Sequence, residues 1–359
     1  MKLTKLQLEN FRNYNKYLFE FEDDKDCTII VGPNGRGKTN LLEAIHVLSL
    51  GKSFRTVYQD DLVNWDQEYM RCNAGLKRDN KEIQLEVFYS SLPLKKKNFK
   101  KNGVNLRNSE YIGNLLTVLF HPEDLNMLYL SPSLRRRYLD TILCQTDKKY
   151  LNALSKYKKV LKQRNALLHK IRETRFERGD ISRLLEDLEA WDCEFLEFGS
   201  YISQKRTEFI DFILSDLEKT YQKISDSPDT INIKYDKHPF TYEELNKRRD
   251  KDIYRAESSC GPHRDNLKFF INGKEISGSA SRGEFRTLLL AIKLGEITYI
   301  KETTGQNPVL LLDDVFSELD SQRQKQLLKA IKGCQTIITT TDVNELGQLT
   351  EESTIMLID

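Results

Sequence analysis

The clearest chemical signal in the sequence is a glycine-rich loop that follows a short apolar run, Thr28–Val31. The loop consists of Gly32, Pro33, Asn34, Gly35, Arg36, Gly37, Lys38 and Thr39. These residues fit the pattern G-x-x-x-x-G-K-[ST] in the strand–loop–helix setting that the pattern requires. The glycines would let backbone N–H groups surround phosphate oxygens, with the positive end of the following helix pointed at them. Lys38 would reach the β- and γ-phosphates and Thr39 would bind Mg²⁺, so the loop predicts a nucleoside triphosphate site.

A second signal is the apolar run Val309–Leu312, which leads into Asp313 and Asp314. Four consecutive apolar residues are typical of a fully buried parallel strand. Carboxylates at the C-terminal end of such a strand face the ligand crevice of the sheet. We therefore assign Asp313 to the Mg²⁺ site, and Asp314 to catalysis as the group that orients water or accepts its proton.

A third signal lies between Ser279 and Arg286, directly before an apolar helix at Thr287–Leu294. Ser281 and Gly283, two residues apart at a helix start, make a second anion-binding terminus. An ordinary helix cap is the simpler explanation of Ser281 when the segment is considered alone. Its place in the chain, ahead of the aspartate strand, favours the anion site.

The segments that must hold these groups differ in their spacing of apolar residues and in their turn signals. Residues 1–130 read as short strands separated by turn signals. From Leu134 to Tyr221 the apolar residues have helical spacing, which predicts two or three long helices with a break near Glu177–Asp180. Strands and turns then return. We expect an α/β fold with mixed sheets, in which residues 1–130 and 228–359 form one domain and residues 131–227 form an inserted, mainly helical lobe.

Composition excludes several classes of protein. Among 359 residues, Lys and Arg total 56 and Asp and Glu total 54, so the net charge of +2 rules out a globally basic, histone-like binder. No apolar run approaches the roughly 18 residues of a membrane helix, and the first residues lack a signal peptide's apolar core. The six cysteines and five histidines are scattered singly, so we expect no metal site built from them. We expect a soluble, cytoplasmic protein without a membrane partner.

A local basic segment is the candidate for DNA contact. Residues 92–109 contain no acidic residue, and Asn102-Gly103 predicts a hairpin turn between two basic strands. The candidate DNA-binding residues are Lys95, Lys96, Lys97, Lys100 and Lys101. A basic hairpin on a nearly neutral protein fits sequence-independent phosphate contact, although a solvated charged loop has the same composition.

The loop, the aspartate pair and the Ser281–Gly283 segment together resemble the ABC-type ATPase head shared by the SMC, Rad50 and RecF proteins. Within this group the sequence is most similar to the RecF family of bacterial recombination mediators, and the similarity runs nearly end to end. The segments that carry it are Asn10–Tyr14, Gly32–Ile45, Gly51–Thr56, Phe120–Leu125, Ser131-Pro132 with Arg135–Arg137, Cys260–Asp265 and Leu310–Asp320. The helical lobe is also too short for the arms of SMC or Rad50, which suits the RecF family.

The resemblance implies that ATP and Mg²⁺ lie between two subunits, so that ATP binding forms a homodimer. It assigns Ser281 to catalysis in trans, and adds Arg12, Gly283 and Asp320 to the nucleotide contacts. The implied activity is a slow, DNA-stimulated ATPase that acts as a switch. The implied role is ATP-gated binding of duplex, gapped or junction DNA in recombinational repair, where the protein works with RecO and RecR to load RecA.

Two departures from the pattern of the group affect the rate of hydrolysis. Glu284 stands where the family usually has Gln, and a carboxylate there would repel ATP unless Arg282 or Arg286 neutralises it. Many ABC enzymes also have Glu at the place of Asp314 and a histidine after the next strand, where this sequence has Thr341-Asp342. A shorter side chain and no histidine favour a slow switch over a motor.

Other functions of a phosphate-binding loop remain as alternatives. A P-loop kinase would need a substrate lid and would not need the Ser281–Gly283 signature. A defence ATPase coupled to a nuclease should carry an added acidic metal cluster. A transport ATPase needs a membrane partner and a Gln-containing loop, where Phe120–Leu125 supplies Glu123. A P-loop ATPase with a client other than DNA is the main alternative.

Overall fold

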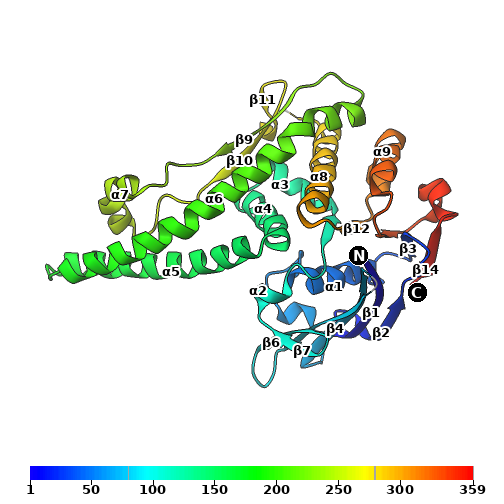
Figure 1. Ribbon diagram of the computed structural model, residues 1–359, viewed down its shortest axis with the longest axis horizontal. Helices are drawn as coiled ribbons and strands as arrows, with labels where there is room; N and C mark the ends of the chain where they lie inside the picture. Colours follow the sequence, from blue (N-terminus) through cyan, green and yellow to red (C-terminus); the bar gives the residue numbers. More distant parts are fainter. Residues whose placement is uncertain (80, 279, 359) are drawn as a thin grey trace. The chain divides into compact units, whose positions relative to one another are not determined.

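The computed structural model describes residues 1–79, 81–278 and 280–358 (Figure 1). Its contacts divide the chain into two compact units. The first unit comprises Met1–Leu128, Asp216–Asp229 and Ala280–Asp359, and the second comprises Tyr129–Ser215 and Thr230–Ser279.

This division differs from the expected one, which placed all of residues 228–359 with the first domain. The segment Thr230–Ser279 instead groups with the helices. The reason is that it forms a small antiparallel sheet of its own, whose central strand packs against a helix of the same unit.

The first unit contains a five-stranded parallel sheet in the order β14-β3-β13-β12-β8. Its strands are β3 (Cys27–Val31), β8 (Thr117–Phe120), β12 (Val309–Asp313), β13 (Thr336–Thr340) and β14 (Ser353–Leu357). Every residue of β12 and β13 is buried, as expected for strands covered on both faces. The helices α1 (Lys38–Leu50) and α8 (Arg282–Thr304) pack against these strands, and α9 (Ser321–Ile331) contacts α8.

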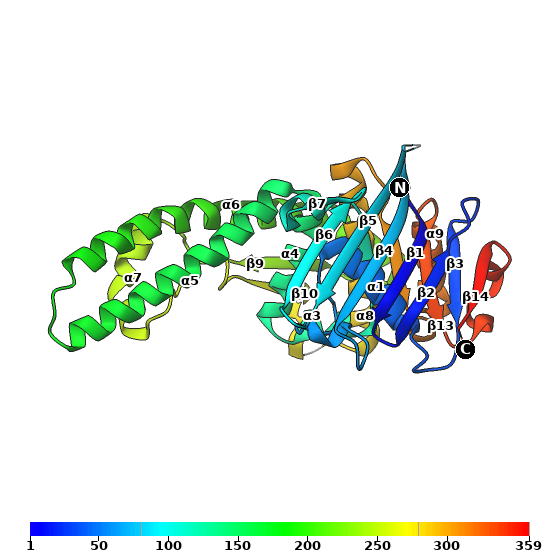
Figure 2. The ribbon, with the colours of Figure 1, turned by 90° about the horizontal axis from the view of Figure 1, so that it is seen from below.

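The same unit contains a six-stranded antiparallel sheet in the order β2-β1-β4-β5-β6-β7, whose strands lie side by side in Figure 2. They are β1 (Lys2–Phe11), β2 (Tyr14–Glu20), β4 (Tyr69–Arg78), β5 (Lys81–Ser90), β6 (Lys96–Lys101) and β7 (Val104–Leu106). The expected turn between β6 and β7 is confirmed, because Asn102 and Gly103 both have positive φ, at 50° and 79°.

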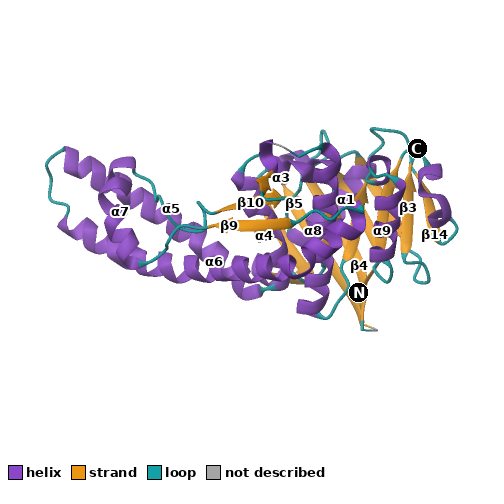
Figure 3. Ribbon diagram, turned by 90° about the horizontal axis from the view of Figure 1, so that it is seen from above, coloured by secondary structure: helices purple, strands orange, loops and turns teal. Residues whose placement is uncertain are grey.

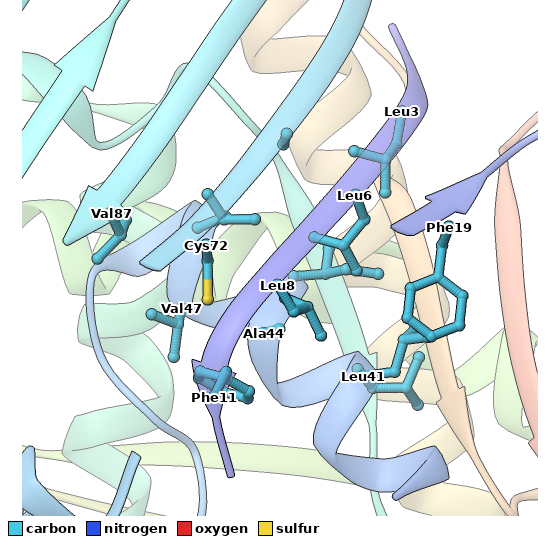
Figure 4. Close-up of a cluster of buried hydrophobic side chains, with 14 of the residues drawn as sticks. Leu3, Leu6, Leu8, Phe11, Phe19, Leu41, Ala44, Val47, Cys72 and Val87 are labelled. Atoms are coloured by element: carbon cyan, nitrogen blue, oxygen red, sulfur yellow. The ribbon is translucent and has the colours of Figure 1, made fainter. Parts of the chain in front are cut away.

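The core of the first unit lies between this antiparallel sheet and α1. Leu6 and Leu8 alternate with polar residues along β1 and point to the face that α1 covers with Leu41 and Ala44 (Figure 4). All four side chains are fully buried. This packing holds the first turn of α1, and with it the phosphate-binding loop, against the sheet.

The second unit consists of long helices and the three-stranded sheet β11-β10-β9. Its elements are α4 (Pro132–Thr146), α5 (Lys148–Phe176), most of α6 (Ser182–Ser225), β9 (Ile231–Asp236), α7 (Tyr242–Arg255), β10 (Asn266–Ile271) and β11 (Lys274–Glu275). α5 and α6 lie alongside each other, with α7 beside α5 (Figure 3). The expected helix break near Glu177–Asp180 is confirmed, since α5 ends at Phe176 and α6 begins at Ser182.

α7 occupies a stretch for which we expected only strands and turns. Its buried apolar residues, Leu245 and Ile253, are too few to give a helical period. The N-cap gives the clearer signal, since the Thr241 side chain accepts a hydrogen bond from the backbone N–H of Glu244.

Short elements complete the chain. They are the helices α2 (Asn108–Tyr111) and α3 (Asn126–Tyr129) and the 3₁₀ turns Asp60–Leu62, Pro122–Leu125, Ile276–Gly278, Phe316–Glu318 and Val343–Thr350. Among the described residues, no helix combines the length and apolar character that a membrane crossing needs.

Candidate nucleotide site

The phosphate-binding loop connects β3 to α1 and leaves no room for larger residues at two glycines. A Cβ atom on Gly32 would lie 2.4 Å from the carbonyl oxygen of Ile358. Gly37 has a φ of 106°, and a Cβ there would lie 2.6 Å from the Asn13 side chain. The loop therefore depends on glycine at both positions, as a backbone cradle for phosphate requires.

The Lys38 side chain is folded into this loop. Its Nζ donates hydrogen bonds to the carbonyl oxygens of Gly32, over 2.6 Å, and Pro33, over 3.0 Å. Burial lowers the pKa of Lys38, and the nearby carboxylates of Asp314 and Asp313 act in the opposite direction. The structure thus brings the expected cation and both expected carboxylates into one electrostatic group.

Asp313 is the centre of the hydrogen bonds in the site. Its Oδ1 accepts a hydrogen bond from Oγ1 of Thr39, over 2.9 Å, and another from Oγ1 of Thr339, over 2.8 Å. Its Oδ2 lies 2.9 Å from Nδ1 of His121. Burial alone would raise the pKa of Asp313, but the hydrogen bonds from these three side chains outweigh it and hold the pKa below its ordinary value.

His121 is a residue of this site that the sequence analysis missed. We considered Glu123 for this segment, whereas the Glu123 side chain is 73% exposed and the His121 side chain is 14% exposed. Phe120 pairs with Leu312 in the parallel register of β8 and β12, so the next residues, His121 and Asp313, emerge side by side. The missing signal was this strand pairing, which the linear sequence does not contain.

Asp314 has an unusual backbone and an unpaired oxygen. Its φ is 50°, in the left-handed region that few residues other than glycine adopt. Its N–H points back to Thr339, whose carbonyl oxygen lies 3.1 Å away. In the described part of the chain, its buried Oδ1 has no hydrogen-bond partner. Burial and the charge of Asp313 raise the pKa of Asp314.

Arg12 lies in a different hydrogen-bond group from the one expected. Its guanidinium binds both carboxylate oxygens of Glu43 in α1, over 2.8 and 2.7 Å. Glu43 is fully buried, and it also accepts a hydrogen bond from Ser53. Arg12 therefore connects the end of β1 to the helix of the phosphate-binding loop. Sequence reasoning missed Glu43, because nothing in the sequence marks this carboxylate as buried.

Ser281 begins α8 in a capping box. Its Oγ accepts a hydrogen bond from the N–H of Glu284, and Oε2 of Glu284 accepts one from the N–H of Ser281, over 2.6 Å. The helix-cap explanation of Ser281 is therefore confirmed, and the carboxylate of Glu284 has a structural partner. Ser279, where the predicted segment began, lies outside the described residues.

Arg323 connects this capping box to Asp320. Its Nη2 donates to the carbonyl oxygen of Gly283, over 3.2 Å, and its Nε donates to Oγ1 of Thr287, over 2.9 Å. The Asp320 side chain caps α9 by accepting from the N–H of Arg323, and it also pairs with the Arg323 guanidinium. Ser281, Gly283 and Asp320 therefore belong to one connected group at the starts of α8 and α9.

Most of the lysines expected to contact DNA are engaged within the protein. Lys95 pairs with Asp60, Lys100 lies 2.7 Å from Glu86, and Lys101 donates to Asn114 over 2.7 Å. Lys97 is the clearest correction, because it donates to the carbonyl oxygen of Gly51 and to the Gln59 side chain. Burial lowers the pKa of Lys97 to about 8. Its place is inside the first unit, whereas Lys96 is exposed.

Thr39 and Asp313 are the residues of this site that would hold Mg²⁺. Hydroxyl and carboxylate oxygens such as those of Thr39 and Asp313 are the ligands that Mg²⁺ prefers. Among the described residues, however, no group of three or more His, Cys, Asp or Glu side chains could hold a metal ion alone. One hydroxyl and one carboxylate next to a phosphate cradle match an ion that retains water and phosphate oxygens as its other ligands.

The chain is similar to known proteins over nearly its whole length. The model of the RecF/RecN/SMC N terminal domain matches residues 2–357. The chain is 39% identical to the DNA replication and repair protein RecF of Bacillus mycoides (strain KBAB4), over 99% of this chain and 96% of that protein. It is 38% identical to the protein of the same name from Bacillus cereus (strain G9842), over 96% and 93%.

Solved structures agree with these similarities. A structure of the recombination mediator RecF with ATP, from the RecFOR pathway, superposes with a TM-score of 0.86 at 36% identity, over 95% of this chain and 92% of that one. The Smc head domain of Pyrococcus furiosus superposes with a TM-score of 0.55 at 18% identity, over 99% and 92%. The Smc likeness concerns the fold alone, and the two together confirm the expected α/β fold of an ABC-type ATPase head.

Proposed function

The chain belongs to the RecF family, and from this premise we propose that it is an ATP-gated DNA-binding protein of recombinational repair. ATP and Mg²⁺ bind at the loop Gly32–Thr39, two chains close around the nucleotides, and the closed dimer holds duplex-containing DNA. Hydrolysis of ATP to ADP and phosphate then releases the DNA. We place the protein in the cytoplasm, where it acts with RecO and RecR towards RecA.

The observation that carries the proposal is the contact between Thr39 and Asp313, which lie 274 positions apart in the sequence. It joins the end of the phosphate cradle to the end of the aspartate strand. In our proposal Thr39 and Asp313 hold Mg²⁺, which neutralises phosphate charge when it is bound. Lys38 leaves the carbonyl oxygens of Gly32 and Pro33 and turns its three N–H donors to the β- and γ-phosphates.

Asp314 is the proposed catalytic carboxylate. Its buried Oδ1 has no partner among the described residues, so a water molecule can be oriented there without breaking an existing bond. Its raised pKa makes the carboxylate a better proton acceptor than an ordinary aspartate. Its side chain is shorter than the glutamate of many ABC enzymes, which supports a slow, switch-like ATPase. In our proposal DNA stimulates the rate of this ATPase.

The second half of the proposed site comes from a partner copy of the chain. Ser281 is exposed at the start of α8, and the Asp320 side chain is 54% exposed. Arg323 connects the start of α8, where Ser281 lies, to the start of α9, where Asp320 lies. The two side chains can therefore approach a nucleotide on the partner together. In this role Ser281 provides its hydroxyl, Gly283 its N–H and Asp320 its carboxylate. A site built in this way is complete only in the dimer.

DNA contact at the hairpin is proposed for Lys95, Lys96, Lys100 and Lys101. Lys96 is available directly, and the other three would exchange a protein partner for a phosphate oxygen, which weakens their net contribution. Lys97 is left out, because it is half-buried and its Nζ donates to the carbonyl oxygen of Gly51 and to the Gln59 side chain.

The experiment that tests the dimer mechanism compares two variants by light scattering after size exclusion, with and without ATP–Mg²⁺. Lys38→Met should lose both nucleotide binding and dimer formation. Ser281→Arg should still bind ATP, measured with a fluorescent analogue, but should remain monomeric. If Ser281→Arg dimerises like the wild type, the assignment of Ser281 to the partner's nucleotide is wrong.

A further inference from the structure

The charge of α5 is strongly one-sided. The helix Lys148–Phe176 contains ten Lys and Arg residues and one acidic residue, Glu173. The neighbouring helix has the opposite bias, since residues 182–200 contain six acidic residues and a single Arg. A protein with a net charge of +2 therefore concentrates positive charge on one helix.

The lysines of α5 form a stripe on its solvent face. Lys148, Lys159 and Lys170 follow one another at intervals of eleven residues, which is about three helical turns, so they project from the same side. All three are exposed, while Tyr157, Val160 and other residues of the opposite face are buried. Four more exposed lysines flank this line: Lys149, Lys156, Lys158 and Lys162.

Within the described part of the chain, the lysines of this face form no ion pair with an acidic side chain. The described residues include no ion pair to Lys148, Lys159, Lys162 or Lys170. Nζ of Lys156 lies over the Phe198 ring, 5.0 Å from its centre. Two acidic side chains of the neighbouring helix pair with arginines instead, Asp192 with Arg164 and Glu189 with Arg249.

The buried arginine of α5 shows where those acidic groups go. Arg164 is fully buried and binds Asp192 over 2.7 Å and Asp252 over 3.0 Å. Glu173 faces His169, at 3.2 Å. The described ion pairs of this unit therefore engage Arg164 on the inner face of α5 and leave the positive charge of its outer lysines uncompensated.

An uncompensated stripe costs stability. Like charges three or four residues apart on a helix repel each other, and Lys158–Lys162 and Lys159–Lys162 have these spacings. Folding alone would favour acidic residues at some of these positions, because i,i+4 ion pairs stabilise a helix. The arrangement is explained if a polyanion supplies the missing negative charge.

We propose that the outer face of α5, defined by Lys148, Lys159, Lys162 and Lys170, binds the phosphate backbone of duplex DNA. The proposal rests on the proposed function and adds to it a binding surface on the second unit. From Lys148 to Lys170 the helix rises about 33 Å. One turn of B-form DNA spans about 34 Å, so the stripe matches one turn of duplex.

The chemistry of this face favours DNA over the two other polyanionic surfaces. Between the lysines lie Asn152, Ser155, Gln163 and Ala166, so the face offers no apolar stripe that could insert into a membrane. An acidic protein partner would also need apolar anchors at the centre of its interface. Phosphates at regular intervals along a rod need only charge, which is what α5 provides.

The test is the binding of the full-length protein to a labelled 24-base-pair duplex with ATP–Mg²⁺, measured by fluorescence anisotropy from 50 to 300 mM salt. The variant is Lys148→Gln/Lys159→Gln/Lys170→Gln, since Gln preserves helix propensity. The matched control, Lys16→Gln/Lys81→Gln/Lys329→Gln, removes three exposed lysines elsewhere. A second variant replaces the three α5 lysines with Arg and retains the charge.

We expect the Gln variant of α5 to bind on the order of 100-fold more weakly at 0.1 M salt, and the slope of log K against log salt to become shallower by about 2.7. The control and the Arg variant should bind like the wild type. On an 8-base-pair duplex, which is shorter than the lysine stripe, most of the difference between the wild type and the Gln variant should disappear.

Two results would overturn the inference in different ways. If the wild type binds DNA and the Gln variant of α5 binds equally well, the α5 surface is wrong and the proposed function stands. If the wild type does not bind duplex DNA, whether or not it binds anionic vesicles, both the α5 surface and the proposed function are wrong. Unfolding temperatures of all variants, expected to stay within a few degrees of the wild type, exclude misfolding as the cause.

Discussion

Nδ1 of His121 lies 2.9 Å from Oδ2 of Asp313, although the two residues are 192 positions apart in the sequence. The contact exists because β8 and β12 are neighbours in the parallel sheet and end at the same edge. It supports the proposed Mg²⁺ ligand from the side opposite Thr39, and makes His121 a positioning residue in our account.

Replacement of His121 should change the pH dependence of the ATPase. The hydrogen bond from His121 helps to hold the pKa of Asp313 below its ordinary value, so His121→Ala should raise that pKa. A carboxylate with a raised pKa is protonated at higher pH, and the acid limb of Mg²⁺-dependent hydrolysis should move to higher pH. His121→Gln can still donate a hydrogen bond and should restore most of the profile. An unchanged acid limb in His121→Ala would remove His121 from the site.

Loss of either proposed Mg²⁺ ligand should abolish Mg²⁺-dependent hydrolysis. Asp313→Asn removes the carboxylate, and Thr39→Val removes the hydroxyl while keeping the shape of the side chain. We expect a decrease of at least about 100-fold in the rate at saturating ATP, as for the loss of a group that stabilises charge in the transition state. Magnesium titrations of steady-state ATPase activity check this. The control Thr298→Val removes a hydroxyl on the far part of α8, and equal loss in that variant would contradict the assignment.

Glu284→Gln tests the departure from the family pattern. Gln can replace Glu in a capping box, so the unfolding free energy should change by less than about 0.5 kcal/mol. Removal of the negative charge beside Ser281 should lower the ATP concentration needed for dimer formation, since less charge repels the partner's nucleotide. Light scattering across an ATP titration measures this. A midpoint that stays the same would show that the capping box already neutralises the charge of Glu284.

The second unit should lose stability in mild acid because of His263. Nδ1 of His263 lies 2.7 Å from Oη of Tyr157, and Nε2 lies 3.1 Å from the carbonyl oxygen of Ser258, so both ring nitrogens have partners. Burial lowers the pKa of His263 to about 4. Between pH 6.5 and pH 4 the unfolded chain binds a proton that the folded chain does not, so stability falls as the pH decreases through this window.

This pH effect amounts to up to about 3 kcal/mol. His263→Gln should flatten the dependence of the unfolding free energy on pH between 6.5 and 4, measured by urea denaturation at several pH values. The control His169→Gln alters a histidine whose side chain is 52% exposed, and should leave the slope as it is in the wild type. A slope that is equally steep in the wild type and His263→Gln would disprove the role of His263.

The sequence was sufficient to identify the elements with strong local signals. The loop Gly32–Thr39 and the strand before Asp313 follow from glycine spacing and an unbroken apolar run, which are properties of adjacent residues. Each was predicted close to its observed bounds because tertiary contacts did not have to be known.

The features that escaped prediction depend on contacts between distant segments. His121 lies in the site because β8 pairs with β12, and the buried carboxylate of Glu43 binds Arg12. Lys97 looked like its neighbours in a basic segment, yet its position in β6 directs its Nζ to Gly51. The surplus of exposed charge on α5 became visible only once the buried face of that helix was known.

The measurement that tests the central claim most directly is the anisotropy of labelled duplex, gapped and single-stranded DNA titrated with the protein, with and without ATP–Mg²⁺. Our account predicts that the wild type binds duplex-containing DNA at least ten times more tightly with ATP–Mg²⁺, and that Lys38→Met loses this difference. Equal affinity with and without ATP–Mg²⁺, or no binding of DNA in either state, would contradict an ATP-gated DNA-binding function and favour a client other than DNA.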